Sequence, residues 1–262
     1  MKPEDVLRVI AAARSTAICI PTMTTAPGWR DIAPDDLSVS CVGFMGGAST
    51  LGLGLALGCP DRRVIVFDGD GSLCMQLGSL PTIAGAAPRN LAHLLFKNNV
   101  YHTSGSQETP GGEGVDYVMM ARGAGYRDAF AVSTLDELER RLPAILTGEG
   151  PLLVELHTGL AEKTPMTDRG GLPFHQQVEK LRGRLQAQRF RAGADLVAPE
   201  LGDAPSARSA IAGRRSPRAP RVSAALADAS VDLRERDRVQ ERDRHVEAGG
   251  RARRSRSRHR RR

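Results

Sequence analysis

The sequence predicts an α/β fold, a doubly wound parallel sheet with helices on both faces, followed by a disordered basic tail. Strand-like and helix-like segments alternate along residues 1–183, which is the pattern of a parallel sheet covered on both sides. The strand-like segments are short apolar runs, and 64–67 is a β-branched run typical of a buried strand. Beyond residue 183 arginine dominates the sequence. We therefore expect a domain of residues 1–183 and a tail of residues 184–262.

Glycines and capping residues place the boundaries of several elements. The run 64–67 stops at Gly69-Asp70-Gly71, where a helix can begin. The Ser133-Thr134 pair provides a capping hydroxyl for the last helix, and early acidic residues follow it. In chain order we expect helices at 3–13, 47–58, 72–86, 115–123 and 135–146, and strands at 16–20, 63–67, 91–96, 129–132 and 152–157.

Charge separates the two parts of the chain. Residues 1–183 carry 16 Lys and Arg against 20 Asp and Glu, a net charge of −4, whereas residues 184–262 carry 21 against 10, a net charge of +11. A tail this rich in arginine can bury too little apolar surface to offset the entropy lost when a chain becomes ordered. We therefore expect the tail to be disordered. Its arginines could bind nucleic acid nonspecifically. A tail without any function is the alternative.

The segments Gly69-Asp70-Gly71 and Asn98-Asn99 form the most informative pair in the sequence. Each follows an apolar run, so in a parallel sheet both lie at strand carboxyl ends, where such sheets bind ligands. Glycines let the backbone approach an anion closely, and the N–H groups from Ser72 onward can point at a phosphate. We therefore expect a phosphate-binding turn at residues 69–72.

A carboxylate and a carboxamide at this separation suit Mg²⁺ bound beside a diphosphate. Mg²⁺ takes about six oxygen ligands, usually few of them from protein. Asp70 supplies one charged oxygen, an asparagine supplies a neutral one, and a main-chain carbonyl just beyond it supplies a third. The diphosphate and water are left for the other positions.

The block from Gly43 to Gln107 resembles the diphosphate-binding domain of thiamine-diphosphate enzymes, and most closely that of sulfopyruvate and phosphonopyruvate decarboxylases. The resemblance extends loosely over residues 1–181. It implies thiamine diphosphate and Mg²⁺ as cofactors, with Asp70 and Asn98 as metal ligands and Val100 as the carbonyl donor. If the second asparagine of the pair is aligned with the family's metal-binding asparagine, the metal ligand is Asn99 and the carbonyl donor is Tyr101.

The same resemblance implies a cofactor-binding loop at Gly43-Phe44-Met45-Gly46-Gly47. Met45 would be the wedge that bends the cofactor, and Gly43 would offer a carbonyl to its pyrimidine; an ordinary core methionine is the alternative. The residues that the resemblance places at the cofactor are Gly43, Met45, Gly46, Gly69, Gly71, Ser72, Asn99 and Tyr101.

The resemblance implies the diphosphate-binding subunit of a 2-oxo acid decarboxylase that acts on a small 2-oxo acid. Such enzymes also need a glutamate on a separate pyrimidine-binding domain, and this sequence leaves no room for that domain. We therefore expect a pyrimidine-binding α-type partner subunit. Carboligation of the acetolactate synthase type is one alternative, and a non-catalytic binding protein with a nucleic-acid-binding tail is another, although the intact Asp70 and Asn98 argue against the second.

Two histidines and the four cysteines complete the sequence evidence. His102 lies in the loop that would face the cofactor, and it is our candidate for binding an anionic substrate or moving a proton; a loop histidine without a role is the alternative. His93 lies within a strand, and we expect a structural role. The cysteines show no metal-binding spacing, no apolar run reaches the ~18 residues of a membrane helix, and the first residues do not form a signal peptide. We expect a soluble, cytoplasmic protein.

Overall fold

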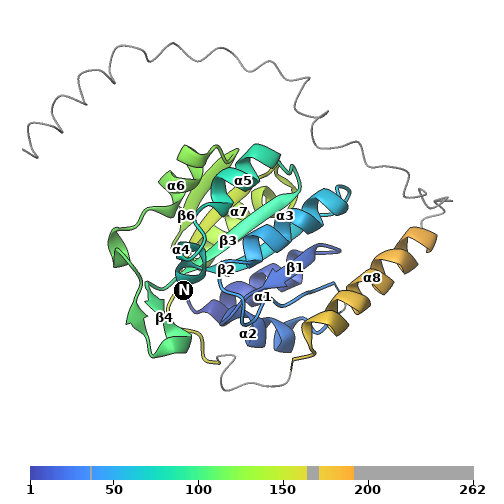
Figure 1. Ribbon diagram of the computed structural model, residues 1–262, viewed down its shortest axis with the longest axis horizontal. Helices are drawn as coiled ribbons and strands as arrows, with labels where there is room; N and C mark the ends of the chain where they lie inside the picture. The colour runs from blue at the N-terminus through green and yellow to red at the C-terminus, as the bar shows by residue number, and fades with distance from the viewer. Residues whose placement is uncertain (36, 164–170, 192–262) are drawn as a thin grey trace, which may run out of the picture. The chain divides into compact units, whose positions relative to one another are not determined.

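The computed structural model describes residues 1–35, 37–163 and 171–191 (Figure 1). Its centre is a parallel five-stranded sheet with the strand order β1-β2-β3-β7-β6. The predicted doubly wound parallel sheet is thereby confirmed. In sheet order the strands are β1 (Ile18–Pro21), β2 (Val64–Gly69), β3 (Leu91–Lys97), β7 (Leu152–His157) and β6 (Asp128–Val132).

Alternate side chains of the strands fill two cores, one on each face of the sheet. On β2, Val64 and Val66 point into one core, and Ile65 and Phe67 point into the other. The first core is covered by α3 (Ala48–Gly58), α5 (Ser79–Ala86), α6 (Tyr117–Ala124) and α8 (Phe174–Arg191). The second is covered by α1 (Pro3–Ala13), α2 (Thr25–Ile32) and α7 (Leu135–Thr147).

Two helices differ from the sequence-based expectation. The helix expected at 72–86 is divided into α4 (Asp70–Cys74) and α5, because the chain turns at Gln76 and Leu77, whose carbonyls accept the first N–H groups of α5. Helix α2 was not predicted, because Pro27 and Gly28 within it are residues that usually interrupt helices.

Helix α8 was also not predicted, and it crosses residue 183, where we expect the domain to end. Leu181 is buried in the core under α8, and Leu185 packs against that core. The domain boundary stays a prediction. From residue 192 onward, the tail that we expect to be disordered lies outside the described residues.

Short elements complete the fold around the carboxyl end of the sheet. After β3, β4 (Val100–Tyr101) and β5 (Gln107–Glu108) pair as a small antiparallel hairpin. Residues 38–41 run parallel to β1 at the edge of the sheet, through bridges from Ser38 to Cys19 and from Cys41 to Thr22. The backbone N–H of Ser40 donates a hydrogen bond to the side chain of Gln177 on α8, at 2.8 Å.

Within the described part of the chain, every helix is too short or too polar to cross a membrane.

Candidate functional site

Asp70 joins the two predicted motifs. It follows β2, whereas Asn98 and Asn99 follow the neighbouring strand β3, so the parallel pairing brings them to one edge of the sheet. The Oδ2 atom of Asp70 accepts hydrogen bonds from the backbone N–H groups of Asn98, at 3.0 Å, and Asn99, at 2.6 Å. Its Oδ1 atom accepts one from the N–H of Gly71, at 2.8 Å. The structure therefore brings the carboxylate and the asparagine pair into direct contact.

The Asp70 carboxylate is buried, with 2% of the residue exposed. Burial raises the pKa of Asp70 above its ordinary value, and the hydrogen bonds from the three N–H groups and the charge of Lys97 partly oppose this rise. The charged form of such a buried carboxylate gains stability when a cation binds beside it.

The main chain after Asn98 favours Asn98 and Val100 as the pair of ligand residues. The carbonyls of Asn99 and Tyr101 accept hydrogen bonds from the N–H groups of Thr109, at 2.9 Å, and Ser106, at 3.0 Å. Since successive residues of an antiparallel strand alternate in direction, the N–H and carbonyl of Val100 face away from β5. That N–H donates to Oδ1 of Asn98 at 3.0 Å, so the Val100 carbonyl lies on the side of the Asn98 carboxamide.

Asn99 provides one observation for the other register. Its backbone has a φ of 62°, in the left-handed region that asparagine adopts more readily than most residues. Its Oδ1 atom is buried and has no hydrogen-bond partner within the described residues. The choice between the two asparagines therefore stays a prediction, in which the main-chain directions favour Asn98 and the unpaired oxygen favours Asn99.

Several of the other residues predicted to bind the cofactor lie around the same turn. A Cβ atom on Gly71 would lie 2.6 Å from the ring of Tyr101, so the Tyr101 ring packs directly on the glycine turn. The hydroxyl of Ser72 accepts a hydrogen bond from the N–H of Gly46 at 2.9 Å. This bond joins the loop at 43–47 to the turn at 69–72.

The loop at 43–47 depends on glycine for its shape and presents apolar side chains. Gly43 and Gly46 have φ values of 80° and 84°, and a Cβ on Gly46 would meet Gln76 at 2.9 Å. Met45 is half-buried, whereas Phe44 is 62% exposed.

His102 begins a short 3₁₀ turn, His102–Ser104, inside the hairpin. Its Nδ1 atom lies 3.3 Å from the hydroxyl of Ser106, so its hydrogen bond stays within its own loop. His102 directly follows the predicted ligand residues in the sequence. Among the described interactions, it makes no contact with Asp70.

Three groups of contacts near this end of the sheet were not identified from the sequence, although His93 itself was expected to be structural. At the carboxyl end of β1, Thr22 donates to the carbonyl of Cys41 at 2.5 Å, and Thr25 donates to the carbonyl of Thr22 at 2.8 Å. The hydroxyl-rich run after an apolar strand was the available signal. Lys97 pairs with Glu155, and His93 pairs with Asp68, from strands that are far apart in sequence.

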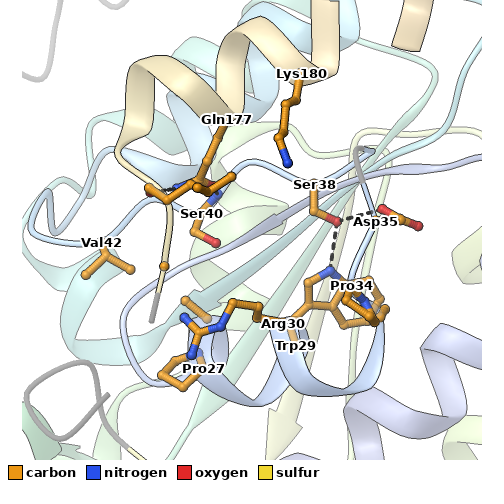
Figure 2. Close-up of a pocket in the computed structure, with 14 residues that line it drawn as sticks. Pro27, Trp29, Arg30, Pro34, Asp35, Ser38, Ser40, Val42, Gln177 and Lys180 are labelled. Carbon is orange, nitrogen blue, oxygen red and sulfur yellow. Dashed lines mark hydrogen bonds between the residues drawn. The ribbon is translucent and has the colours of Figure 1, made fainter. Parts of the chain in front are cut away.

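A cavity lies elsewhere, between α2, residues 38–42 and α8 (Figure 2). Its volume is about 410 Å³, and Arg30 and Lys180 approach it from opposite walls in Figure 2. Val42 lines this cavity and precedes Gly43, so the cavity adjoins the loop at 43–47, and its lining does not include the predicted ligand residues.

The residues around Asp70 fit a hydrated Mg²⁺ bound to a diphosphate. A buried carboxylate, a carboxamide oxygen and a main-chain carbonyl supply few protein ligands, as Mg²⁺ prefers. Among the described residues there is no group of three or more His, Cys, Asp or Glu that could hold a metal.

Comparison with known proteins gives a consistent result. The family model described as thiamine pyrophosphate enzyme, C-terminal TPP binding domain, matches residues 24–156. Over 115 residues the chain is 47% identical to a phosphonopyruvate decarboxylase of Streptomyces hygroscopicus, covering 44% of this chain and 28% of that protein. Over 108 residues it is 42% identical to the sulfopyruvate decarboxylase subunit beta of Methanocaldococcus jannaschii, covering 41% of this chain and 56% of that subunit.

The matched regions span between about a quarter and about half of the length of these two relatives. Among solved structures, benzoylformate decarboxylase from Polynucleobacter necessarius superposes with a TM-score of 0.52 at 22% identity, over 63% of this chain and 34% of that one. At this identity the structural likeness supports the fold alone.

Proposed function

Because the chain belongs to the thiamine pyrophosphate enzymes, through their C-terminal TPP binding domain, we propose that it anchors thiamine diphosphate and Mg²⁺ in a 2-oxo acid decarboxylase. The single observation that carries the proposal is the contact of the Asp70 carboxylate with Asn98 and Asn99 at the carboxyl edge of the sheet. This contact holds a buried carboxylate against the backbone of the two asparagines, and a carboxylate, a carboxamide oxygen and a main-chain carbonyl are the kinds of ligand that suit Mg²⁺.

In the proposed site, Asp70, Asn98 and the carbonyl of Val100 bind the metal. Asn99 and Tyr101 then shape the chain beside it. Gly69, Gly71 and Ser72 form the turn that faces the diphosphate, and Gly43, Met45 and Gly46 form the loop that holds the rest of the cofactor. Thiamine diphosphate, when bound, supplies the electron sink that permits loss of carbon dioxide from a 2-oxo acid.

The proposed substrate is a small 2-oxo acid with a second anionic group. The two relatives named above are called phosphonopyruvate and sulfopyruvate decarboxylases, which supports this class. His102 is the proposed anion-binding or proton-moving residue, since it follows the ligand residues in the same loop and Ser106 orients its ring.

We further propose that a second polypeptide with a pyrimidine-binding domain completes the active site. The relative from Methanocaldococcus jannaschii is named as a beta subunit, which supports a partner of the α type. Phe44 is 62% exposed and Met75 is 56% exposed. They lie near each other, because Gly46 and Gln76, which are close to them in sequence, are in contact. Two exposed apolar side chains near the loop at 43–47 suit such a partner. A cytoplasmic location and nonspecific nucleic-acid binding by the tail stay predictions.

Calorimetric titration with thiamine diphosphate of the full chain, assembled with the partner subunit that copurifies with it, tests the proposal. We expect binding that requires Mg²⁺ and is lost in Asp70→Ala, because the metal then lacks its charged protein ligand. Asp128→Ala is the matched control, since Asp128 begins β6 at the opposite end of the sheet, and it should bind normally. Binding that is equally tight in EDTA or in Asp70→Ala would overturn the metal site.

A further inference from the structure

Lys97 closes the segment that carries the proposed ligand residues. The segment 98–115 starts immediately after Lys97, and its last residue, Val115, accepts a hydrogen bond from the Lys97 ammonium at 2.6 Å. One side chain thus joins the two ends of the segment. Only 10% of the Lys97 side chain is exposed, so this bond is largely shielded from water.

Glu155 on β7 balances the buried charge of Lys97. Its Oε1 atom lies 3.4 Å from the Lys97 ammonium, and 6% of its side chain is exposed. The same Oε1 atom lies 2.8 Å from Nε2 of His157, and the Oε2 atom accepts a hydrogen bond from the N–H of Tyr117 at 3.2 Å. The carboxylate therefore holds both the start of the segment and the residue that opens α6 after it.

Tyr117 extends this network to the other side of the proposed metal site. Its hydroxyl donates to the carbonyl of Asp70 at 3.4 Å and lies 2.9 Å from the Cys74 sulfur. The Lys97 ammonium lies 5.8 Å from the centre of the Tyr117 ring. One carboxylate is thus linked to the Asn98 side of the site through Lys97 and to the Asp70 side through Tyr117.

We propose that Lys97 and Glu155 are positioning residues, which hold segment 98–115 against the Asp70 turn at the separation that the metal requires. This inference rests on the proposed function, because it is the metal that gives the separation its importance. Partners that orient metal ligands affect metal affinity without touching the ion, commonly by 10- to 100-fold.

The test compares Lys97→Met, Glu155→Gln and the double variant in the full chain. Titration with Mn²⁺ in the presence of thiamine diphosphate, with free Mn²⁺ read by electron paramagnetic resonance, gives the metal affinity. We expect each single variant to weaken Mn²⁺ binding about 10-fold and to speed amide hydrogen exchange in segment 98–115. Lys163→Met removes an exposed ion pair with Asp31, and this control should leave both measurements unchanged.

The double variant separates positioning from stability. A single variant removes one half of the Lys97–Glu155 ion pair and lowers the thermal unfolding temperature, whereas the double variant removes both charges and should recover most of that temperature. It still lacks the bond to Val115, so its Mn²⁺ affinity should stay low. Recovery of the affinity together with the stability, or affinities within twofold of the unaltered chain in all three variants, would overturn the inference.

Two further outcomes are decisive. If the single variants do not fold, Tyr117→Phe keeps the ring and removes only its hydroxyl, and unchanged Mn²⁺ affinity in both Tyr117→Phe and the double variant would reject the positioning role. An unaltered chain that binds no Mn²⁺ with thiamine diphosphate even when it is assembled with its partner subunit would refute the proposed function instead. In that event the hydrogen exchange of 98–115 still decides whether Lys97 and Glu155 hold the segment.

Discussion

The imidazole of His93 lies 3.2 Å from the carboxylate of Asp68, and neither side chain is exposed. His93 is on β3 and Asp68 is on β2, directly before the turn at Gly69. The other ring nitrogen of His93 lies 3.4 Å from the hydroxyl of Tyr126, and Oδ1 of Asp68 accepts the N–H of Gly69 at 3.0 Å. The pair therefore supports the turn from within the sheet, which agrees with the structural role expected for His93.

His93→Leu should lower the free energy of unfolding by about 3–5 kcal/mol, because it leaves Asp68 buried without its partner. Urea unfolding followed by circular dichroism measures this loss. The double variant His93→Leu/Asp68→Asn should recover part of it, since no ionised carboxylate is then left alone. A His93→Leu variant as stable as the unaltered chain would show that the contact contributes nothing.

The choice between the two asparagines can be decided by matched variants. Asn98→Ala should weaken Mg²⁺-dependent binding of thiamine diphosphate at least about 10-fold, because a metal ligand is lost. Asn99→Gly should keep most of the affinity, since glycine adopts the left-handed backbone of this position without strain. Calorimetry gives both affinities. The opposite order would assign the metal to Asn99 and Tyr101.

Two glycines of α3 should respond to alanine with opposite signs. A Cβ on Gly52 would lie 2.3 Å from the Val66 side chain, whereas a Cβ on Gly54 would meet no atom within 4 Å. Gly52→Ala should destabilise the protein by about 1–3 kcal/mol through overpacking. Gly54→Ala should stabilise it by about 0.5–1 kcal/mol through helix propensity. Urea unfolding midpoints provide the comparison, and equal effects would contradict the packing of α3 on β2.

Cysteine reactivity should follow burial. Burial raises the pKa of Cys19 to about 12, although Arg14 opposes the rise, and burial followed by the charge of Asp68 raises the pKa of Cys41. At pH 8 only about one Cys19 side chain in 10⁴ is then the reactive thiolate. Cys74 is partly exposed, so iodoacetamide should label it first, as mass spectrometry of peptides would show. Cys19 labelling at the rate of Cys74 would contradict its burial.

Truncation tests both the domain boundary and the basic tail. Removing residues 192–262 deletes 18 arginines, and it should abolish retention on heparin, a retention that falls steeply with salt in the full chain. The thermal unfolding temperature should stay unchanged. Truncation after Gly183 also removes Leu185, which packs against the core, and it should lower that temperature. Equal unfolding temperatures of the two truncated forms would support a domain that ends at residue 183.

Local signals in the sequence were sufficient for the sheet and for the contact between the two motifs. Apolar runs located all five strands of the sheet, and the turn after β2 and the asparagines after β3 were placed at one edge by the parallel topology alone. The same reasoning failed for α2, where Pro27 and Gly28 lower helix propensity and burial of Trp29 compensates.

Contacts between distant strands could not be predicted in the same way. Lys97 and Glu155 are 58 residues apart, and their contact depends on β7 pairing with β3, a strand order that periodicity does not contain. The left-handed backbone of Asn99 likewise depends on the hairpin that follows it. These features arise from tertiary packing, which a pattern of hydrophobic and polar residues leaves open.

The hydrogen bond from Ser40 to Gln177 also affects whether the edge of the sheet can pair with a second copy of this protein. Residues 38–41 lie beside β1 at the outer edge of the sheet, and an open edge is a template on which another chain can add a strand. Since the side chain of Gln177 accepts the outward N–H of Ser40, that donor is not available to a neighbouring molecule. Helix α8 thus covers one donor of this sheet edge, which leaves fewer groups on which a second copy could add a strand.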